Sequence, residues 1–226
     1  MLLLNSLLGL GLGSLAPAPA VLVLPDYTTY NAAPLMAPAQ PGLLGGDFEF
    51  SYTFLELGFY STDVDLANET SDAYHGRASL GLLWLLYIYL DYAEESVEFM
   101  GADVDTDTLE LGLGGHFGLG SRFDLVGEVG FLSDDSSSSL SQADGSETGY
   151  NAYLGGRWLA LPTSTGGLEL NGGYRYVDLE SPLADDSLGA WEVGARFHFL
   201  SLFSIGADYS LREDDSRVGF NARVSF

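Results

Sequence analysis

The chain has 226 residues, with 32 acidic residues against 8 basic ones, a formal net charge of −24 and no cysteine. All of the basic residues are Arg, so nothing supplies the basic stripe that would neutralise nucleic-acid phosphates. The absence of Cys excludes disulfides and thiolate metal sites. Abundant Gly and an aromatic content of 13% favour closely spaced strands over helices. The length allows one all-β domain.

The first 46 residues differ from the rest of the chain. Residues 1–20 are an apolar run that ends in the small residues Ala16-Pro-Ala-Pro-Ala20, which predicts a secretory signal peptide. No basic residue precedes the apolar run, so an unprocessed hydrophobic leader or a wrongly assigned start is the alternative. Residues 21–46 are rich in Pro, Ala and Gly and predict an irregular linker.

From residue 47 to residue 226 the chain divides into segments of alternating hydrophobicity. The last segment is the clearest example, with one apolar face made of Val218, Phe220, Ala222, Val224 and Phe226. This period of 2 predicts extended strands, and its recurrence predicts a barrel with lipid outside and a polar interior. The predicted strands are 47–61, 76–84, 86–95, 106–117, 122–133, 148–160, 167–179, 188–199, 203–212 and 216–226. We therefore predict an all-β, transmembrane antiparallel up-and-down β-barrel of ten strands, with eight strands as the alternative.

Two details of the strands are less regular. The alternation changes phase between Phe54 and Leu55, which predicts a β-bulge there. Residues 78–90 are almost wholly apolar, but they are too short to span a membrane as a helix, which needs about 20 residues. They predict a tight hairpin that turns near Trp84–Leu86.

The connections between the segments fall into two alternating classes. Those around residues 85, 118–121, 161–166 and 200–202 are short and almost uncharged, whereas 62–75, 96–105, 134–147, 180–187 and 213–215 are acidic and mostly longer. Aromatic residues gather near both classes, as expected for rings at the two boundaries of a membrane. A soluble β-sandwich is the alternative fold, but it gives no reason for aromatic residues at both rims.

The strand register assigns a set of ionisable side chains to the lumen. This set, together with His116 and His198, is Glu56, Arg77, Asp91, Glu110, Asp124, Glu128, Arg157, Glu169, Arg175, Glu192, Arg196, Asp208, Arg212, Arg217 and Arg223. Its acids and Arg residues nearly balance, so the lumen is expected to be close to neutral and the net charge to lie in the loops. Guanidinium–carboxylate pairs across such a narrow barrel would fill it. The network either only stabilises the barrel or leaves a thin hydrated pore.

Several segments resemble one known group of proteins. They are Phe54-Leu-Glu-Leu-Gly-Phe59, Tyr87-Ile-Tyr-Leu-Asp-Tyr92, Leu109-Glu-Leu-Gly-Leu-Gly-Gly115, Leu168-Glu-Leu-Asn-Gly-Gly-Tyr-Arg-Tyr-Val-Asp178 and the terminal Phe226. Over residues 47–226 the chain is similar to the small outer-membrane β-barrels of Gram-negative bacteria, the OmpA/OmpX-like group. The resemblance implies that Phe226 belongs to the signal read by the barrel-assembly machinery. It also implies a structural, adhesive or weakly pore-forming role.

The three histidines are the candidate catalytic residues, and the acidic groups are candidate metal ligands. Some barrels of this size are proteases or deacylases, but only His75, which we place in the first acidic loop near Asp72, lies where a surface substrate could reach it. No nucleophile motif accompanies it, so we predict no enzyme and no cofactor. The alternating acids Asp103, Asp105 and Asp107 and the acid pairs of other loops could bind divalent cations or bridge to lipopolysaccharide. A solvated acidic surface is the alternative.

The sequence thus predicts a monomeric protein of the bacterial outer membrane, in contact with lipid and lipopolysaccharide. Its expected role is structural or surface-interacting, and its alternative role is a narrow passive porin for small solutes or cations.

Overall fold

The computed structural model describes residues 50–64, 69–99, 102–138, 145–163, 166–180, 185–199, 202–212 and 215–226. The predicted signal peptide and linker lie outside these residues. The described part forms β1 (Phe54–Val64), β2 (Glu69–Gly81), β3 (Leu86–Phe99), β4 (Ala102–Gly118), β5 (Phe123–Ser138), β6 (Gly145–Thr163), β7 (Gly166–Glu180), β8 (Asp185–Phe199), β9 (Phe203–Arg212) and β10 (Asp215–Ser225). Among the described residues, no helix is long and apolar enough to cross a membrane.

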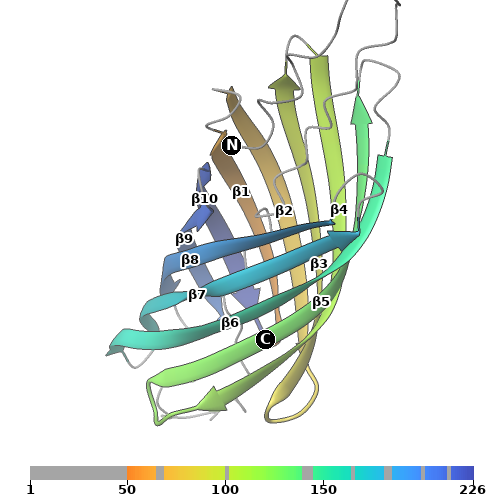
Figure 1. Ribbon diagram of the computed structural model, residues 1–226. Coiled ribbons are helices and arrows are strands. Elements are labelled where there is room, and N and C mark those ends of the chain that lie inside the picture. Colours follow the sequence, from red (N-terminus) through yellow and green to blue (C-terminus); the bar gives the residue numbers. More distant parts are fainter. Residues whose placement is uncertain are drawn as a thin grey trace, which may run out of the picture.

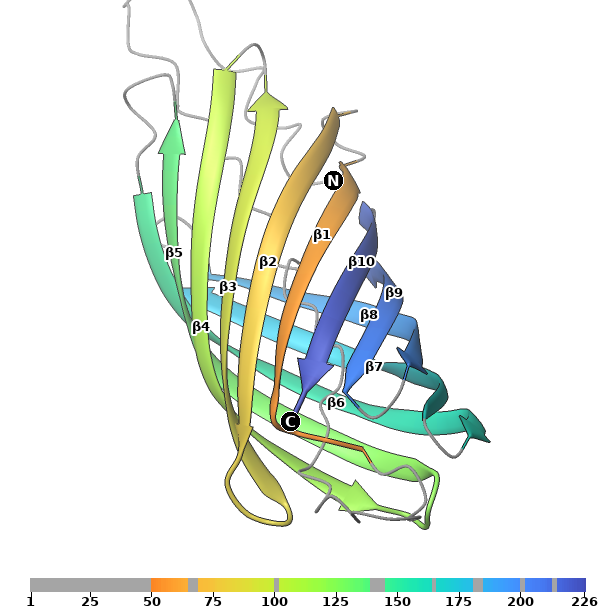
Figure 2. The ribbon, with the colours of Figure 1, turned by 180° about the vertical axis from the view of Figure 1, so that it is seen from behind.

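These ten strands close into a single barrel in which each strand pairs antiparallel with its neighbours in the sequence. The first and last strands complete the ring, because Leu55 pairs with Val224 and Phe59 with Phe220. Figures 1 and 2 show the strands following one another around the wall, strongly tilted. The predicted ten-strand up-and-down barrel is confirmed.

The two ends of the barrel differ in their connections. At one end, here called the short-turn end, the tight turns at residues 82–85 and 119–122 join β2 to β3 and β4 to β5. Gly120 in the second of these turns has a φ of 99°, which favours glycine. The described ends of the chain also meet there, because the Phe226 amide donates to the Thr53 carbonyl at 2.9 Å. The opposite end, here called the loop end, carries the connections at residues 65–68, 100–101, 139–144, 181–184 and 213–214. Most of these are no longer than the turns at the short-turn end, which corrects the predicted difference in length.

The strands run further toward the loop end than the sequence predicted. β4 starts at Ala102 instead of residue 106, and β6 covers Gly145–Thr163. In β4, Asp105 and Asp107 are exposed on the outer face while Thr106 and Thr108 are buried. Asp105, predicted to lie in the loop 96–105, therefore belongs to a strand, which corrects the prediction. Both faces are polar here, so hydrophobic alternation could not reveal the extension.

The predicted bulge in the first strand is wrong. Phe54 is buried and Leu55 is exposed, and β1 pairs with both of its neighbours in an unbroken register. The phase seemed to change because Phe54 points into the lumen and not toward lipid. The register instead shifts in β6, between Leu159 and Leu161.

The outer surface of the wall is a continuous apolar belt. Leu57, Leu111 and Leu154 are 72%, 61% and 63% exposed, and every strand contributes similar residues. The predicted rim aromatics also face outward; for example, Trp84 near the short turns and Trp191 near the loop end are both exposed. An apolar surface of this extent would drive association in water and is what a bilayer-spanning barrel presents to lipid.

Large aromatic side chains pack over inward glycines. A Cβ added to Gly114 would lie 1.9 Å from the Tyr87 ring, and one added to Gly112 would lie 2.1 Å from the Tyr89 ring. These positions need glycine because each ring lies flat against the backbone of β4. The glycines thus make room for tyrosines that reach the centre of the lumen.

Candidate functional site

The lumen is the candidate functional site, because the inward face of each strand brings its polar side chains there. Buried members of the predicted set are Glu56, Arg77, Asp91, Glu110, Asp124, Glu128, Arg157, Glu169, Arg175, Glu192, Arg196, Arg217 and Arg223. Asp208 and Arg212 are half-buried. Charges in such a position need partners, since removing one partner of a buried pair is strongly destabilising.

One network crosses the middle of the barrel. Arg77 of β2 donates from Nη2 to Glu128 Oε1 of β5 at 2.9 Å, and its Nη1 lies 3.1 Å from Asp91 Oδ2. Glu128 Oε2 lies 3.8 Å from Arg175 Nη2 of β7. Arg175 Nε donates to Glu192 Oε1 at 2.9 Å. Charged groups therefore span the lumen from β2 to β7.

A second network joins the seam between the first and last strands to the rest of the wall. Glu56 Oε2 of β1 accepts from Arg196 Nη1 of β8 at 2.6 Å and from Arg223 Nε of β10 at 2.7 Å. Arg196 Nη2 also donates to Asn221 Oδ1 at 2.8 Å. One carboxylate thus holds two guanidinium groups that come from different strands.

A third network lies on β6, β7 and β8. Arg157 Nε donates to Glu169 Oε1 at 2.8 Å, and Arg157 Nη2 contacts the other oxygen of the same carboxylate. That second oxygen also lies 2.8 Å from His198 Nε2. His198 is therefore a buried partner of this network.

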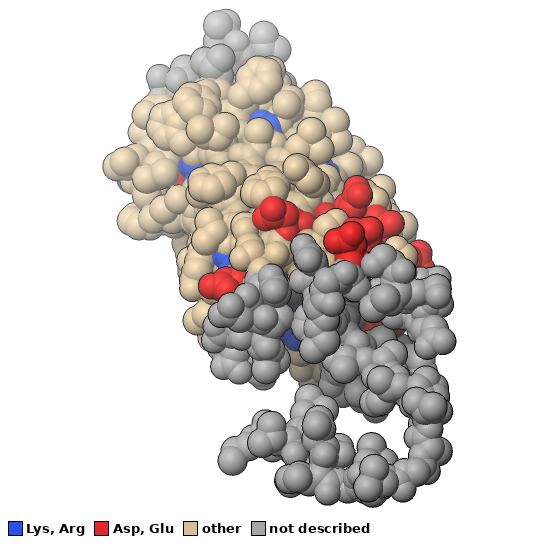
Figure 3. Space-filling view, turned by 90° about the horizontal axis from the view of Figure 1, so that it is seen from above, with Lys and Arg blue, Asp and Glu red and all other residues tan. Residues whose placement is uncertain are grey.

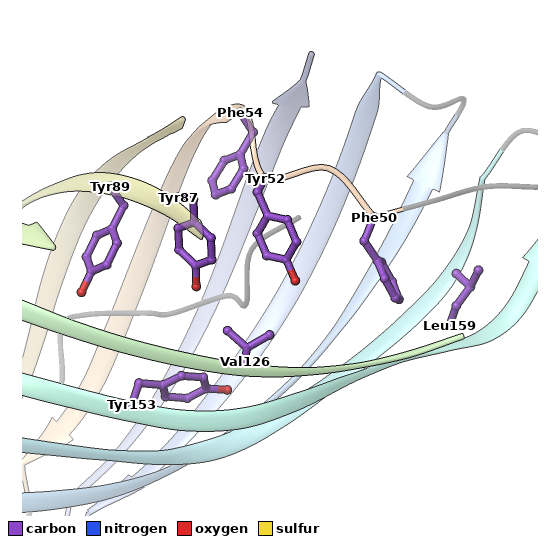
Figure 4. Packing of buried hydrophobic residues seen from close by; sticks show 8 residues of the cluster. All are labelled: Phe50, Tyr52, Phe54, Tyr87, Tyr89, Val126, Tyr153 and Leu159. Atoms are coloured by element: carbon purple, nitrogen blue, oxygen red, sulfur yellow. The ribbon is translucent and has the colours of Figure 1, made fainter. Parts of the chain in front are cut away.

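Aromatic rings fill the space between the charged groups. The Arg77 and Arg223 guanidinium carbons lie 4.1 Å and 3.9 Å from the centroids of Tyr89 and Phe54, positions that favour cation–π attraction. Tyr89 donates its hydroxyl to Glu110 Oε1 at 2.5 Å. Figure 4 shows these rings pointing into the barrel with Phe50, Tyr52, Tyr87, Val126, Tyr153 and Leu159.

Sequence reasoning missed these lumenal aromatics. It assigned the lumen to charged residues alone and the aromatic rings to the rims. A signal was present, because Tyr87 and Tyr89 share the alternation phase of the inward Asp91. Likewise Phe54 shares the phase of Glu56.

The charges are also divided between two sides of the barrel, which the sequence count did not reveal. Strands β3–β5 carry the buried acids Asp91, Glu95, Glu110, Asp124, Glu128 and Asp134. Among the described residues of those three strands there is no Arg at all. The inward Arg residues other than Arg77 lie on β6–β10. The inward acids and Arg residues are therefore divided unevenly around the wall, and opposite charges attract each other over the shared space.

One small cavity lies in the lumen near its loop end. This cavity, lined by Tyr60, Glu192, Asp208 and Arg217, among others, measures about 10 Å³. That volume is at the lower limit for one water molecule. This cavity therefore has room for no more than about one water molecule.

The catalytic candidate His75 lies in a different place from the one predicted. It belongs to β2 and not to a loop, is 6% exposed, and its Nε2 lies 2.6 Å from the Tyr60 hydroxyl. The strand extension described above brings it into the lumen. His116 is half-buried and stacks on Tyr52 with a centroid distance of 3.8 Å. None of these imidazoles faces an open rim.

Acidic side chains gather at the surface near the loop end. Asp72, Glu94, Asp103, Asp105, Asp107 and Asp135 are exposed, and Tyr92 donates its hydroxyl to Asp107 Oδ1 at 2.7 Å. Seen from above, carboxylates form patches, whereas Arg shows only in small areas (Figure 3). Within the described residues, no three His, Cys, Asp or Glu side chains are grouped so that they could hold a metal ion.

Comparisons with known proteins support the fold. The sequence matches no family model and no curated protein. In structure, the chain is similar to the translocator domain of the autotransporter NalP from Neisseria meningitidis, with a TM-score of 0.51 and 14% identity over 76% of this chain and 87% of that one. The transport unit of the autotransporter AIDA-I from Escherichia coli gives 0.47 at 10% identity, covering 76% and 89%. The KdgM porin gives 0.42 at 12% identity, covering 77% and 99%.

The closed barrel, its apolar outer belt and its polar lumen together define the class of protein. The chain is an integral β-barrel of the bacterial outer membrane. Membership of the OmpA/OmpX-like group stays a prediction.

Proposed function

We propose that this protein is a closed barrel with a structural or surface-interacting role. The observation that carries the proposal is the ion-pair network from Arg77 through Glu128 to Arg175, which runs from one wall of the lumen to another. Neighbouring pairs and tyrosines occupy the space around it. A barrel whose lumen is filled in this way anchors its loop-end surface in the membrane.

The presented surface is acidic. The exposed carboxylates of β3–β5 lie directly beyond the apolar belt, toward the loop end. On the outer face of β4, for example, Asp107 lies two residues before Leu109. At this height they would meet lipopolysaccharide headgroups, and divalent cations could bridge the two sets of negative groups. The terminal Phe226 is 64% exposed, so it is open to recognition by the barrel-assembly machinery.

A narrow, cation-preferring porin is the second candidate. The concentration of acids on β3–β5 favours it, because a path along that wall would attract cations. The two functions differ in permeability.

Swelling of proteoliposomes in an isotonic solution of a small neutral sugar tests the proposal. Liposomes with the refolded barrel should swell no faster than empty ones. The same swelling measurement is made on a variant in which Arg77, Glu128 and Arg175 are all replaced by Ser, because this variant lacks the ion-pair network across the lumen. Rapid swelling with the unaltered barrel would overturn the closed-barrel proposal and favour the porin.

A further inference from the structure

Four residues in front of β1 lie inside the barrel. Residues 50–53, here called the strap, belong to no strand, yet Phe50, Ser51 and Tyr52 are buried. The strap leaves the base of β1 and runs across the end of the barrel (Figure 2). Phe50 reaches β6, where the Arg157 guanidinium lies 4.4 Å from the centroid of its ring. In the ring of strands β6 stands five places from β1 in either direction, so the strap spans the mouth from wall to opposite wall.

Tyr52 packs against β3, β4 and β5 at this mouth. Its ring stacks on Tyr87 of β3 at 4.8 Å and 10°, and on His116 of β4 at 3.8 Å and 29°. Its hydroxyl donates to Asp124 Oδ2 of β5 at 3.1 Å. The side chain is 0% exposed, so three strands close around one ring.

The strap is also fastened at the seam of the barrel. Ser51 donates its hydroxyl to the backbone oxygen of Phe226 at 3.1 Å. The Gly81 amide donates to Thr53 Oγ1 at 3.1 Å, and Ser79 donates its hydroxyl to the Tyr52 carbonyl at 3.0 Å. Apart from the backbone bond from the Phe226 amide to the Thr53 carbonyl, these bonds involve side chains, and they form no continuous backbone ladder. A segment held in this way can open locally at a lower free energy than a strand.

We propose that the strap is a built-in plug that closes the lumen at the short-turn end. It seals one mouth through the rings of Phe50 and Tyr52, and it can be displaced without opening the sheet. This goes beyond the proposed function, because the strap covers its mouth whether or not the middle of the lumen conducts.

Thiol labelling tests the plug directly, since the chain contains no cysteine. Val126 faces inward and belongs to the buried cluster that contains Phe50 and Tyr52, so Val126→Cys places a single thiol under the strap. In the refolded barrel this thiol should react slowly with a charged, water-soluble maleimide. Adding Phe50→Ala and Tyr52→Ala should speed its labelling at least about tenfold, because the local opening no longer has to displace the two rings.

Two controls separate a plug from general loosening. Thr106 is buried on β4 toward the loop end. The thiol of Thr106→Cys should be labelled at the same rate with and without the rings of Phe50 and Tyr52. Tyr52→Phe keeps the stacked ring and should keep the Val126→Cys thiol protected. If the double variant does not refold, the single Tyr52→Ala variant replaces it. Equal labelling of the Val126→Cys thiol in the intact and ring-truncated strap would overturn the proposal, and so would equal acceleration at Thr106→Cys.

Discussion

Arg77 and Glu128 form an ion pair across the lumen, with Nη2 and Oε1 separated by 2.9 Å. The two residues lie on β2 and β5, and β3 and β4 stand between these strands in the wall. The pair therefore does not join adjacent strands of the sheet. It joins two separate parts of the wall through the interior of the barrel. Such a contact requires a narrow barrel, and it places charged groups in the interior.

Replacing Glu128 by Ala should destabilise the barrel strongly. The change leaves Arg77 short of one carboxylate and takes the acceptor from the Tyr87 hydroxyl, and breaking a buried pair costs about 3–5 kcal/mol. The free energy of unfolding, measured by urea titration in lipid, checks this. Val129→Ala, at the exposed position next in the strand, is the matched control and should cost far less. Equal losses for the two variants would contradict a structural role for the pair.

Glu56 and Arg223 should show a measurable coupling free energy. Glu56→Gln removes the negative charge that serves Arg196 and Arg223 together, whereas Arg223→Met removes only one of the two cations. We expect the double variant to lose less stability than the sum of the single variants, by about 0.5–3 kcal/mol. A double-mutant cycle of unfolding free energies measures this, and simple additivity would show that the pair adds nothing.

The same substitution at two adjacent glycines on β4 should have different effects on stability. At Gly114 a Cβ would lie 1.9 Å from the Tyr87 ring, whereas at Gly115 its nearest neighbour is the Leu85 carbonyl oxygen at 3.5 Å. Gly114→Ala should therefore cost about 1–3 kcal/mol through overpacking, and Gly115→Ala should be close to neutral. Thermal unfolding of the two variants provides the comparison. A neutral Gly114→Ala would mean that Tyr87 does not lie against that backbone.

Arginine scanning along one outer face should locate the membrane. Val129 and Ser137 both face outward from β5, the first within the apolar belt and the second near the loop end. Val129→Arg should cost about 2–4 kcal/mol and Ser137→Arg about 0–1 kcal/mol, as expected for the bilayer centre and its boundary. Folding titrations into lipid vesicles report both values. Similar costs at the two positions would place the belt outside the bilayer.

Much of the fold could be predicted from the sequence because one face of nearly every strand is apolar. The alternation from Phe123 to Phe131 specifies both the strand and its outward face. It stops being informative where both faces are polar, as from Asp103 to Thr108, so the strand extensions were missed. His75 was placed in a loop for the same reason.

The interior was harder to predict because alternation gives the face of a residue but not its neighbours. Glu128 was assigned to the lumen, yet nothing in the sequence indicates that its partner is Arg77 on a strand that is not adjacent. The attraction across the lumen depends on which strands face each other after closure. The strap was missed because Phe50 and Tyr52 continue an alternating pattern that also fits a strand.

Single-channel conductance of the refolded chain in a planar bilayer tests the closed lumen most directly. The side-chain network predicts no steady openings from a barrel shown to be folded. Steady openings whose reversal potential in a salt gradient shows cation selectivity would contradict it, and would make the acids of β3–β5 the lining of a pore.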